Sequence, residues 1–189
     1  MRFIKTSIPE VIIIEPKVFT DQRGYFFESY NQKACETNIG KMNFVQDNES
    51  RSVFGTLRGL HYQIPPFAQS KLARVIQGRV LDVAVDIRKG SHTFGKWVSV
   101  ELSDENKRQV FIPCGFAHGF VVLSREAVFA YKVDIFYSRE HERGIIYNDP
   151  DLNIEWQINE SQILLSDKDR QLPFLKNVEL FLYNQDCCL

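Results

Sequence analysis

One short segment of the chain combines residue types that suit acid–base chemistry. Residues 57–63 read Leu-Arg-Gly-Leu-His-Tyr-Gln and predict a strand that carries His61. Because imidazole titrates near neutral pH, His61 is a candidate for taking a proton from carbon. A lone histidine on a strand is more often a structural residue, so this segment alone decides nothing. Strict alternation puts Arg58 and His61 on opposite faces, whereas a bulge at Gly59 lets both reach one pocket.

Three further features place polar groups in predicted strands or turns. Tyr131 shares the apolar face of its strand with Phe129 and Val133, and Lys71 begins the predicted strand 72–76. Residues 167–170 read Asp-Lys-Asp-Arg. Each has an ordinary interpretation, as a core tyrosine, a solvated strand end and a surface turn. Taken singly, these features assign no chemistry.

A histidine motif bears on metal binding. Pro113, Gly115 and His118 have the spacing P-x-G-x-x-H, which resembles the second sequence motif of the cupin superfamily of small β-barrels. Metal-binding cupins carry two histidines separated by one residue on an earlier strand, where this chain reads His-Tyr-Gln from His61. The sequence therefore predicts no metal site, and a site built from His61, His118 and an acid stays the alternative.

The elements that must position these residues follow a period of two. Residues 80–87 predict a half-buried strand, and residues 128–136 predict a strand with Phe129 and Tyr131 on one face. Residues 31–39 predict a short helix that Gly40 ends. Many short strands favour a sandwich, jelly roll or barrel over βαβ units. The remaining strand candidates are residues 11–14, 98–102, 110–112 and 119–123.

Composition limits the class of protein. A chain of 189 residues with 44% hydrophobic and 25% charged residues predicts a single globular domain, residues 1–189, with a less regular C-terminal arm from about residue 150. A net charge of −1 favours neither nucleic acid nor an anionic membrane as a partner. The four cysteines match no zinc pattern. Without a signal-peptide pattern or a span-length apolar segment, we expect a cytoplasmic protein.

Six segments, taken together and in order, resemble the dTDP-4-dehydrorhamnose 3,5-epimerases. The likeness runs from Ile4 to about Pro173. It implies a mainly β cupin jelly roll with a few short helices, needing no cofactor. It also implies a homodimer in which an N-terminal segment crosses to the partner. The segments are residues 21–28, 44–48, 58–63, 115–120, 131–132 and 165–169.

The resemblance also implies a role for each matching residue. His61 corresponds to the base, Asp169 to the carboxylate behind it, Tyr131 to the acid on the opposite face of the sugar, and Lys71 to the cation beside the ketone oxygen. Tyr137 corresponds to an aromatic that stacks on thymine. Arg23 and Glu28, from the N-terminal segment, are expected to serve the neighbouring subunit. Positions that hold nucleotide, diphosphate or sugar are matched by Arg23, Glu28, Gln46, Asp47, Asn48, Arg58, His118, Glu142 and Lys168.

The implied reaction is epimerisation at C3 and C5 of dTDP-4-dehydro-6-deoxy-D-glucose to dTDP-4-dehydro-L-rhamnose, in the biosynthesis of dTDP-L-rhamnose for lipopolysaccharide or another cell-surface polysaccharide. Removing a proton beside a ketone needs a base, a cation for the enolate and a second proton carrier for inversion, which accounts for these residue types. Three alternatives stay open: epimerisation of one carbon only, a metal-dependent cupin enzyme, and a sugar-nucleotide binding module without catalysis.

Overall fold

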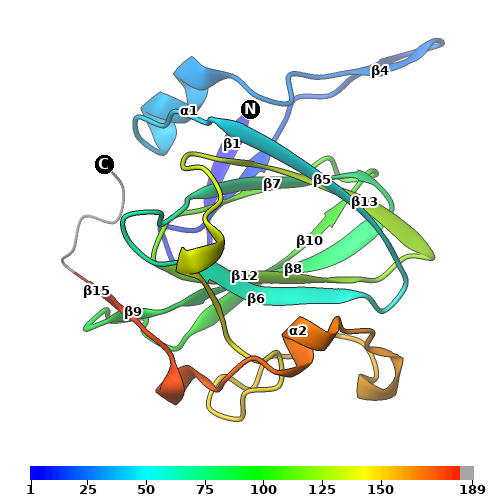
Figure 1. Cartoon of the computed structure of the whole chain (residues 1–189). Helices are drawn as coiled ribbons and strands as arrows, with labels where there is room; N and C mark the ends of the chain where they lie inside the picture. Colours follow the sequence, from blue (N-terminus) through cyan, green and yellow to red (C-terminus); the bar gives the residue numbers. More distant parts are fainter. Residues whose placement is uncertain (184–189) are drawn as a thin grey trace.

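Two antiparallel sheets face each other and form most of the molecule (Figure 1). The computed structural model describes residues 1–183. The predicted mainly β jelly-roll fold with few and short helices is confirmed. No helix among the described residues has the length and apolarity that crossing a membrane requires.

The sheets differ in size. In spatial order, the six-stranded sheet contains β1 (Arg2–Lys5), β2 (Ile12–Glu15), β11 (Gln109–Ile112), β7 (Lys71–Gln77), β13 (Glu126–Val133) and β5 (Gln46–Val53). The five-stranded sheet contains β10 (Trp97–Ser103), β8 (Arg79–Asp86), β12 (Phe116–Val122), β6 (Leu57–Gln63) and β14 (Glu142–Gly144). Two small pairs are β3 (Phe19–Asp21) with β4 (Gly24–Phe26), and β9 (Arg88–Lys89) with β15 (Phe181–Leu182). The helices are α1 (Gln32–Asn38) and α2 (Asp167–Arg170), with 3-10 turns η1 (Arg139–His141), η2 (Glu160–Gln162) and η3 (Leu175–Asn177).

Strand β8 is buried on both faces, so the prediction of a half-buried strand was wrong. Val80 and Ala84 point between the sheets, into the core that also holds Phe129. Val83 and Val85 point outward, yet they pack against the segment that follows β14. Figure 1 shows that segment, orange to red, running beneath the five-stranded sheet. A period of two cannot reveal that a distant part of the chain covers the second face.

The strand expected over residues 128–136 is β13, which ends at Val133, three residues before the predicted end. The carboxylate of Asp134 accepts a hydrogen bond from the Ser70 backbone N–H at 2.7 Å. Burial is the main influence on this carboxyl and raises its pKa. The chain leaves the sheet at Asp134, and Tyr137 lies in the loop that follows.

The short helix predicted over residues 31–39 is confirmed as α1. The Asn31 side chain caps it by accepting a hydrogen bond from the Ala34 N–H at 3.1 Å. Gly40 follows with a φ of +123°, a left-handed conformation that suits glycine. Residues around the helix, including Tyr30 and Phe44, pack on the outer face of the six-stranded sheet.

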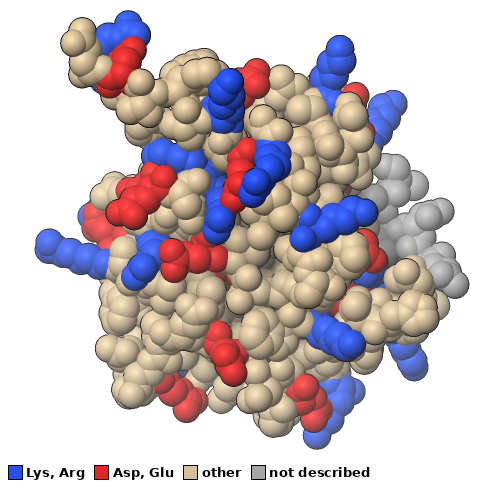
Figure 2. Space-filling model, turned by 180° about the vertical axis from the view of Figure 1, so that it is seen from behind, with Lys and Arg blue, Asp and Glu red and all other residues tan. Residues whose placement is uncertain are grey.

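The β3–β4 hairpin projects from the barrel (Figure 1). Its aromatic residues are largely accessible, since Phe19 is 54%, Tyr25 58% and Phe26 69% exposed. Figure 2 shows the projection at its upper left, and charges of both signs alternate over that face of the molecule. Aromatic side chains so exposed on one arm indicate a contact surface rather than part of this chain's own core.

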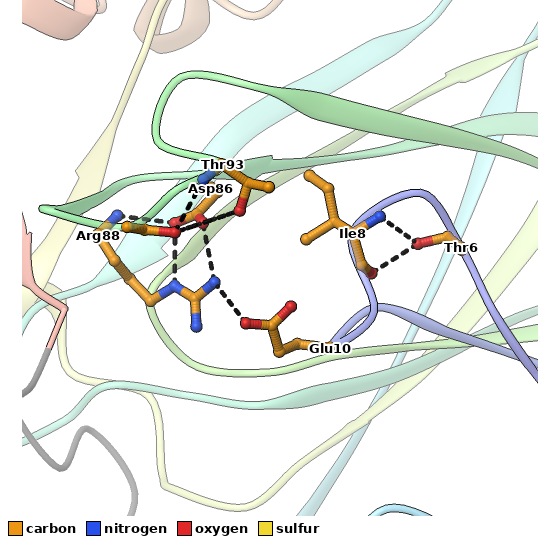
Figure 3. A network of polar contacts seen from close by, with 7 residues as sticks. Thr6, Ile8, Glu10, Asp86, Arg88 and Thr93 are labelled. Atoms are coloured by element: carbon orange, nitrogen blue, oxygen red, sulfur yellow. Dashed lines mark hydrogen bonds and ion pairs between the residues drawn. The ribbon is translucent and has the colours of Figure 1, made fainter.

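A buried ion-pair network fastens the N-terminal segment to the end of β8 (Figure 3). Asp86 is inaccessible to solvent and accepts hydrogen bonds from Arg88, Ser91 and Thr93. Arg88 also contacts Glu10 at 3.1 Å. Burial opposes ionisation of Asp86, but the hydrogen bonds outweigh it and hold the pKa of the carboxyl below its ordinary value. Removal of one partner would leave a buried charge uncompensated, so the network links these two segments.

Candidate active site

A cavity of about 660 Å³ lies between the two sheets and is closed on one side by the segment at α2. This volume is in the range of small-molecule sites. Residues from β5, β6, β7, β12, β13 and β14 line it, together with residues of the connecting loops and of the segment at α2. Of the site residues predicted from sequence, its walls contain Asn48, Arg58, His61, Lys71, His118, Tyr131, Tyr137, Glu142, Lys168 and Asp169.

A bulge in β6 brings Arg58 and His61 to this one cavity. His61 lies opposite His118 on β12, and the register shifts between that pair and the pairing of Arg58. Gly59 has a φ of +132°, and a Cβ atom there would lie 2.5 Å from the Cα of Gly119. Glycine is therefore needed for this close approach of backbones. Of the two arrangements open from sequence, the bulge is confirmed.

His61 and Asp169 form a histidine–carboxylate pair. The Nε2 atom of His61 lies 2.6 Å from an oxygen of Asp169, which is almost fully buried. Ser166 caps α2 and donates from its hydroxyl to the other carboxylate oxygen at 2.8 Å. Burial opposes ionisation of Asp169, but the bonds from His61 and Ser166 hold its pKa below the ordinary value. An ionised Asp169 accepts the proton on Nε2, so Nδ1 of His61 carries the lone pair that can act as a base.

Lys71 and Tyr131 reach the cavity from the opposite sheet. The Lys71 ammonium lies 3.5 Å from the carbonyl oxygen of His61 and 5.9 Å from the centre of the Tyr131 ring. Burial lowers the pKa of Lys71 to about 8, so it is not the solvated strand end of the ordinary interpretation. Burial also raises the pKa of Tyr131, whose hydroxyl thus stays protonated at neutral pH. The cavity therefore has an imidazole that can act as a base on one sheet, and an ammonium and a protonated phenol on the other.

A second histidine–carboxylate pair was not predicted from the sequence. The Nε2 atom of His118 lies 2.8 Å from an oxygen of Asp82, and both residues are buried. The available signal was an acid within the apolar run of β8, which the half-buried interpretation assigned to solvent. Ser166 was also missed, although a serine three residues before Asp169 matches a capping pattern.

At one end of the cavity, a chain of side chains holds Tyr137. Its hydroxyl donates to Glu142 at 2.7 Å, and Glu142 also pairs with Lys168. Burial opposes ionisation of Glu142, but these two partners hold its pKa below the ordinary value. The backbone N–H of Tyr137 donates to the side chain of Gln46 at 3.3 Å, which places Gln46 beside the cavity although not on its wall. Tyr137 itself is 54% exposed.

Three predicted site residues lie away from the cavity of this chain. Arg23 is at the hairpin tip, where it pairs with Asp21, and Glu28 accepts a hydrogen bond from Asn31. Asp47 points to the outer face of the six-stranded sheet and pairs with Lys132. Their roles stay predictions.

The donors needed for a metal centre are not gathered in the part of the chain that the structure describes. Residues 1–183 contain no group of three or more histidine, cysteine, aspartate or glutamate side chains placed to hold an ion. His61 and His118 each face a single carboxylate instead. Cys187 and Cys188 lie outside the described residues.

Comparisons with known proteins agree with one another. The profile of the dTDP-4-dehydrorhamnose 3,5-epimerase family matches residues 5–177. The enzyme of that name from Shigella flexneri is 62% identical over 89% of this chain and 93% of its own length. The one from Pseudomonas aeruginosa is 59% identical over 96% and 99%. The crystal structure of the Legionella pneumophila dTDP-6-deoxy-D-glucose-3,5-epimerase in complex with dTDP-4-keto-L-rhamnose superposes with a TM-score of 0.94 at 52% identity, covering 97% of this chain and 99% of that one. The chain belongs to the dTDP-4-dehydrorhamnose 3,5-epimerase family.

Proposed function

We propose that this chain epimerises C3 and C5 of dTDP-4-dehydro-6-deoxy-D-glucose and so forms dTDP-4-dehydro-L-rhamnose, with no cofactor. One observation carries the proposal: the pair formed by His61 on β6 and Asp169 on α2 faces Tyr131 and Lys71 on the six-stranded sheet, across a cavity of about 660 Å³. The dTDP-4-keto-L-rhamnose bound to the Legionella enzyme is the same compound as the proposed product, and it supports this class of ligand for the chain.

In the proposed mechanism, Nδ1 of His61 removes the proton from a carbon beside the C4 ketone. The electron pair of the broken C–H bond moves to the ketone oxygen, and Lys71 stabilises the resulting enolate. Asp169 stabilises the imidazolium that forms. When the pair returns to carbon, Tyr131 supplies a proton from the opposite face, which inverts the centre. Because one proton leaves and one enters, no oxidant or reductant is needed.

The rest of the cavity is assigned to the dTDP group and the sugar. Tyr137 offers an exposed ring on which a thymine can stack. Arg58 donates through Nε to Ser52 at 3.1 Å, which orients its terminal nitrogens as a fork for phosphate oxygens. Lys168 adds a positive charge nearby. Asn48 and His118, also on the wall, are assigned to polar contacts with the sugar nucleotide.

The function itself is tested by product analysis. The purified chain is incubated with dTDP-4-dehydro-6-deoxy-D-glucose, and the product is trapped with a 4-ketoreductase specific for the L-rhamno configuration. Accumulation of dTDP-L-rhamnose supports the proposal. A sugar inverted at one carbon indicates the single-carbon reaction, and tight binding of dTDP without any product indicates a binding module. Activity that tracks stoichiometric iron or manganese in elemental analysis indicates the metal-dependent alternative.

Tyr131→Phe is expected to separate proton removal from inversion. The variant keeps His61 and Lys71, so deuterium from D2O still enters the sugar, whereas formation of the inverted product falls about 100-fold for want of the opposing acid. NMR of the sugar protons measures both quantities in one sample. Tyr147→Phe, which removes a hydroxyl bound to Glu160 outside the cavity, is the matched control. Equal loss of deuterium uptake and inversion, with dTDP affinity intact, would show that the roles of His61 and Tyr131 are assigned the wrong way round.

A homodimer with exchanged hairpins is also part of the proposal. The exposed aromatics of the β3–β4 hairpin offer a surface for a partner, and Arg23, at the tip of that arm, is not on the wall of the cavity of its own chain. We expect chromatography with light scattering to give twice the chain mass of 22.0 kDa.

Mixed dimers test the exchange. Arg23→Ala and His61→Ala protomers are each expected to be weakly active or inactive alone. After mixing and reassociation, an exchanged dimer has one site with both residues intact, and activity returns. A monomeric chain, or mixed dimers without any gain in activity, would contradict the exchange.

A further inference from the structure

The side chain of Gln63 is buried, and both its amide nitrogen and its amide oxygen form hydrogen bonds to the backbone of two loops. It lies at the end of β6, two residues after His61, and is only 4% exposed. Its amide nitrogen donates to the carbonyl oxygens of Phe67 at 2.7 Å and Phe136 at 3.4 Å. Its amide oxygen accepts from the backbone N–H of Ser138 at 2.7 Å. A buried amide satisfied in this way fixes the backbone it contacts.

The hydrogen bonds of Gln63 reach the residues immediately before and after Tyr137 in the sequence. Phe136 and Ser138 are the immediate neighbours of Tyr137, so the amide holds the backbone on both sides of that aromatic residue. The Tyr137 ring is exposed, and its other restraints are single hydrogen bonds to Gln46 and Glu142. The bond to Phe67 joins the same amide to the loop that follows β6.

We propose that Gln63 is a positioning residue: its side-chain amide fixes the loop of Tyr137 so that the ring is ready to stack on the nucleotide base. This inference rests on the proposed function, because it takes Tyr137 to be the base-stacking residue. Gln63 acts through Tyr137 and takes no part in proton transfer. A preorganised loop binds a ligand more tightly because less conformational freedom is lost on binding.

The chemistry of the position selects glutamine. Two of the three backbone groups are acceptors and one is a donor, which only a neutral amide satisfies together. Methionine has a similar length and no comparable hydrogen-bonding capacity. Glutamate keeps the acceptor for Ser138 but has no N–H to donate and places a charge beside two carbonyl oxygens.

Calorimetric titration with dTDP tests the proposal. Gln63→Met is expected to weaken dTDP affinity about 10-fold and to raise KM for the sugar nucleotide similarly, with kcat within about twofold of the wild type. Gln77→Met is the matched control. The Gln77 amide donates to the side chain of Glu126 at 3.4 Å, and Gln77 is not on the cavity wall, so its loss is expected to change dTDP affinity less than about twofold.

A double-mutant comparison separates positioning of Tyr137 from a general structural effect. In the Tyr137→Ala background, Gln63→Met is expected to weaken dTDP binding no further, because the ring it positions is absent. Additive losses in the double variant would overturn the inference, as would a fall in kcat with unchanged affinity. If Gln63→Met does not fold, Gln63→Glu provides the same comparison.

The outcomes also distinguish this inference from the proposed function. If Tyr137→Ala weakens dTDP binding but Gln63→Met does not, only the role of Gln63 is wrong. If Tyr137→Ala leaves dTDP affinity unchanged, the stacking role assigned under the proposed function fails, and the role of Gln63 fails with it.

Discussion

His61→Ala is expected to lower kcat by roughly 1,000-fold, within the range that a positioned general base contributes. His61 is the histidine paired with a buried carboxylate at 2.6 Å across the cavity from Tyr131 and Lys71, and no other group is assigned to take the first proton. Affinity for dTDP is expected to stay within a few-fold, because the base is assigned to the sugar end of the site. Steady-state kinetics and calorimetry measure the two effects separately.

The control for this prediction is His92→Ala, which removes an exposed histidine outside the cavity and is expected to change neither quantity. A folded His61→Ala enzyme with near wild-type kcat contradicts the assignment of the base. A variant that also loses dTDP affinity would instead indicate that His61 holds the ligand or the local structure.

Lys71→Met is expected to lower kcat by about 100- to 1,000-fold, as for the loss of one group that stabilises a developing oxyanion. Methionine keeps most of the side-chain length and removes the charge. Affinity for dTDP is again expected to change little, since the enolate forms only during the reaction. A Lys71→Met enzyme that retains activity within a few-fold would show that another group stabilises the enolate.

The pH dependence offers a second measurement on the same residue. Burial lowers the pKa of Lys71 to about 8, so the ammonium is charged below that pH and is lost as the pH rises through it. The kcat/KM of the wild type is therefore expected to fall above about pH 8. Tyr131 cannot produce this limb, because its pKa is raised above the ordinary tyrosine value. In Lys71→Arg, whose guanidinium stays charged, the alkaline limb should disappear even if the maximal rate is lower.

The sequence predicted the local elements well where local rules decide them. The helix at 31–39 is capped by Asn31 and followed by Gly40, and residues 57–63 form β6 as expected. The predictions from sequence failed where segments distant in the sequence determine whether a side chain is buried. The outer face of β8 is covered by the segment after β14, and burial in the fold lowers the pKa of Lys71, whose ammonium lies near the carbonyl oxygen of His61.

Two neighbouring residues on β5 show that the family likeness marked candidate site residues but did not tell which of them face the cavity. The likeness to the family marked both Asp47 and Asn48, yet successive side chains on a strand point to opposite faces. Asn48 lines the cavity, whereas Asp47 pairs with Lys132 on the outside. Asp82 was missed because its strand was interpreted as half-buried. An acid within the apolar run of β8 signals an unusual position, but the sequence does not show that its partner is the buried His118.

The most direct test of the central claim is NMR of dTDP-4-dehydro-6-deoxy-D-glucose incubated with the wild-type chain in D2O. If His61 removes protons beside the C4 ketone at both carbons, deuterium replaces hydrogen at C3 and at C5, and the signals of both protons disappear. Deuterium at one carbon alone would contradict epimerisation at both positions, and retention of both protons over many equivalents of enzyme would contradict proton abstraction as the function of this site.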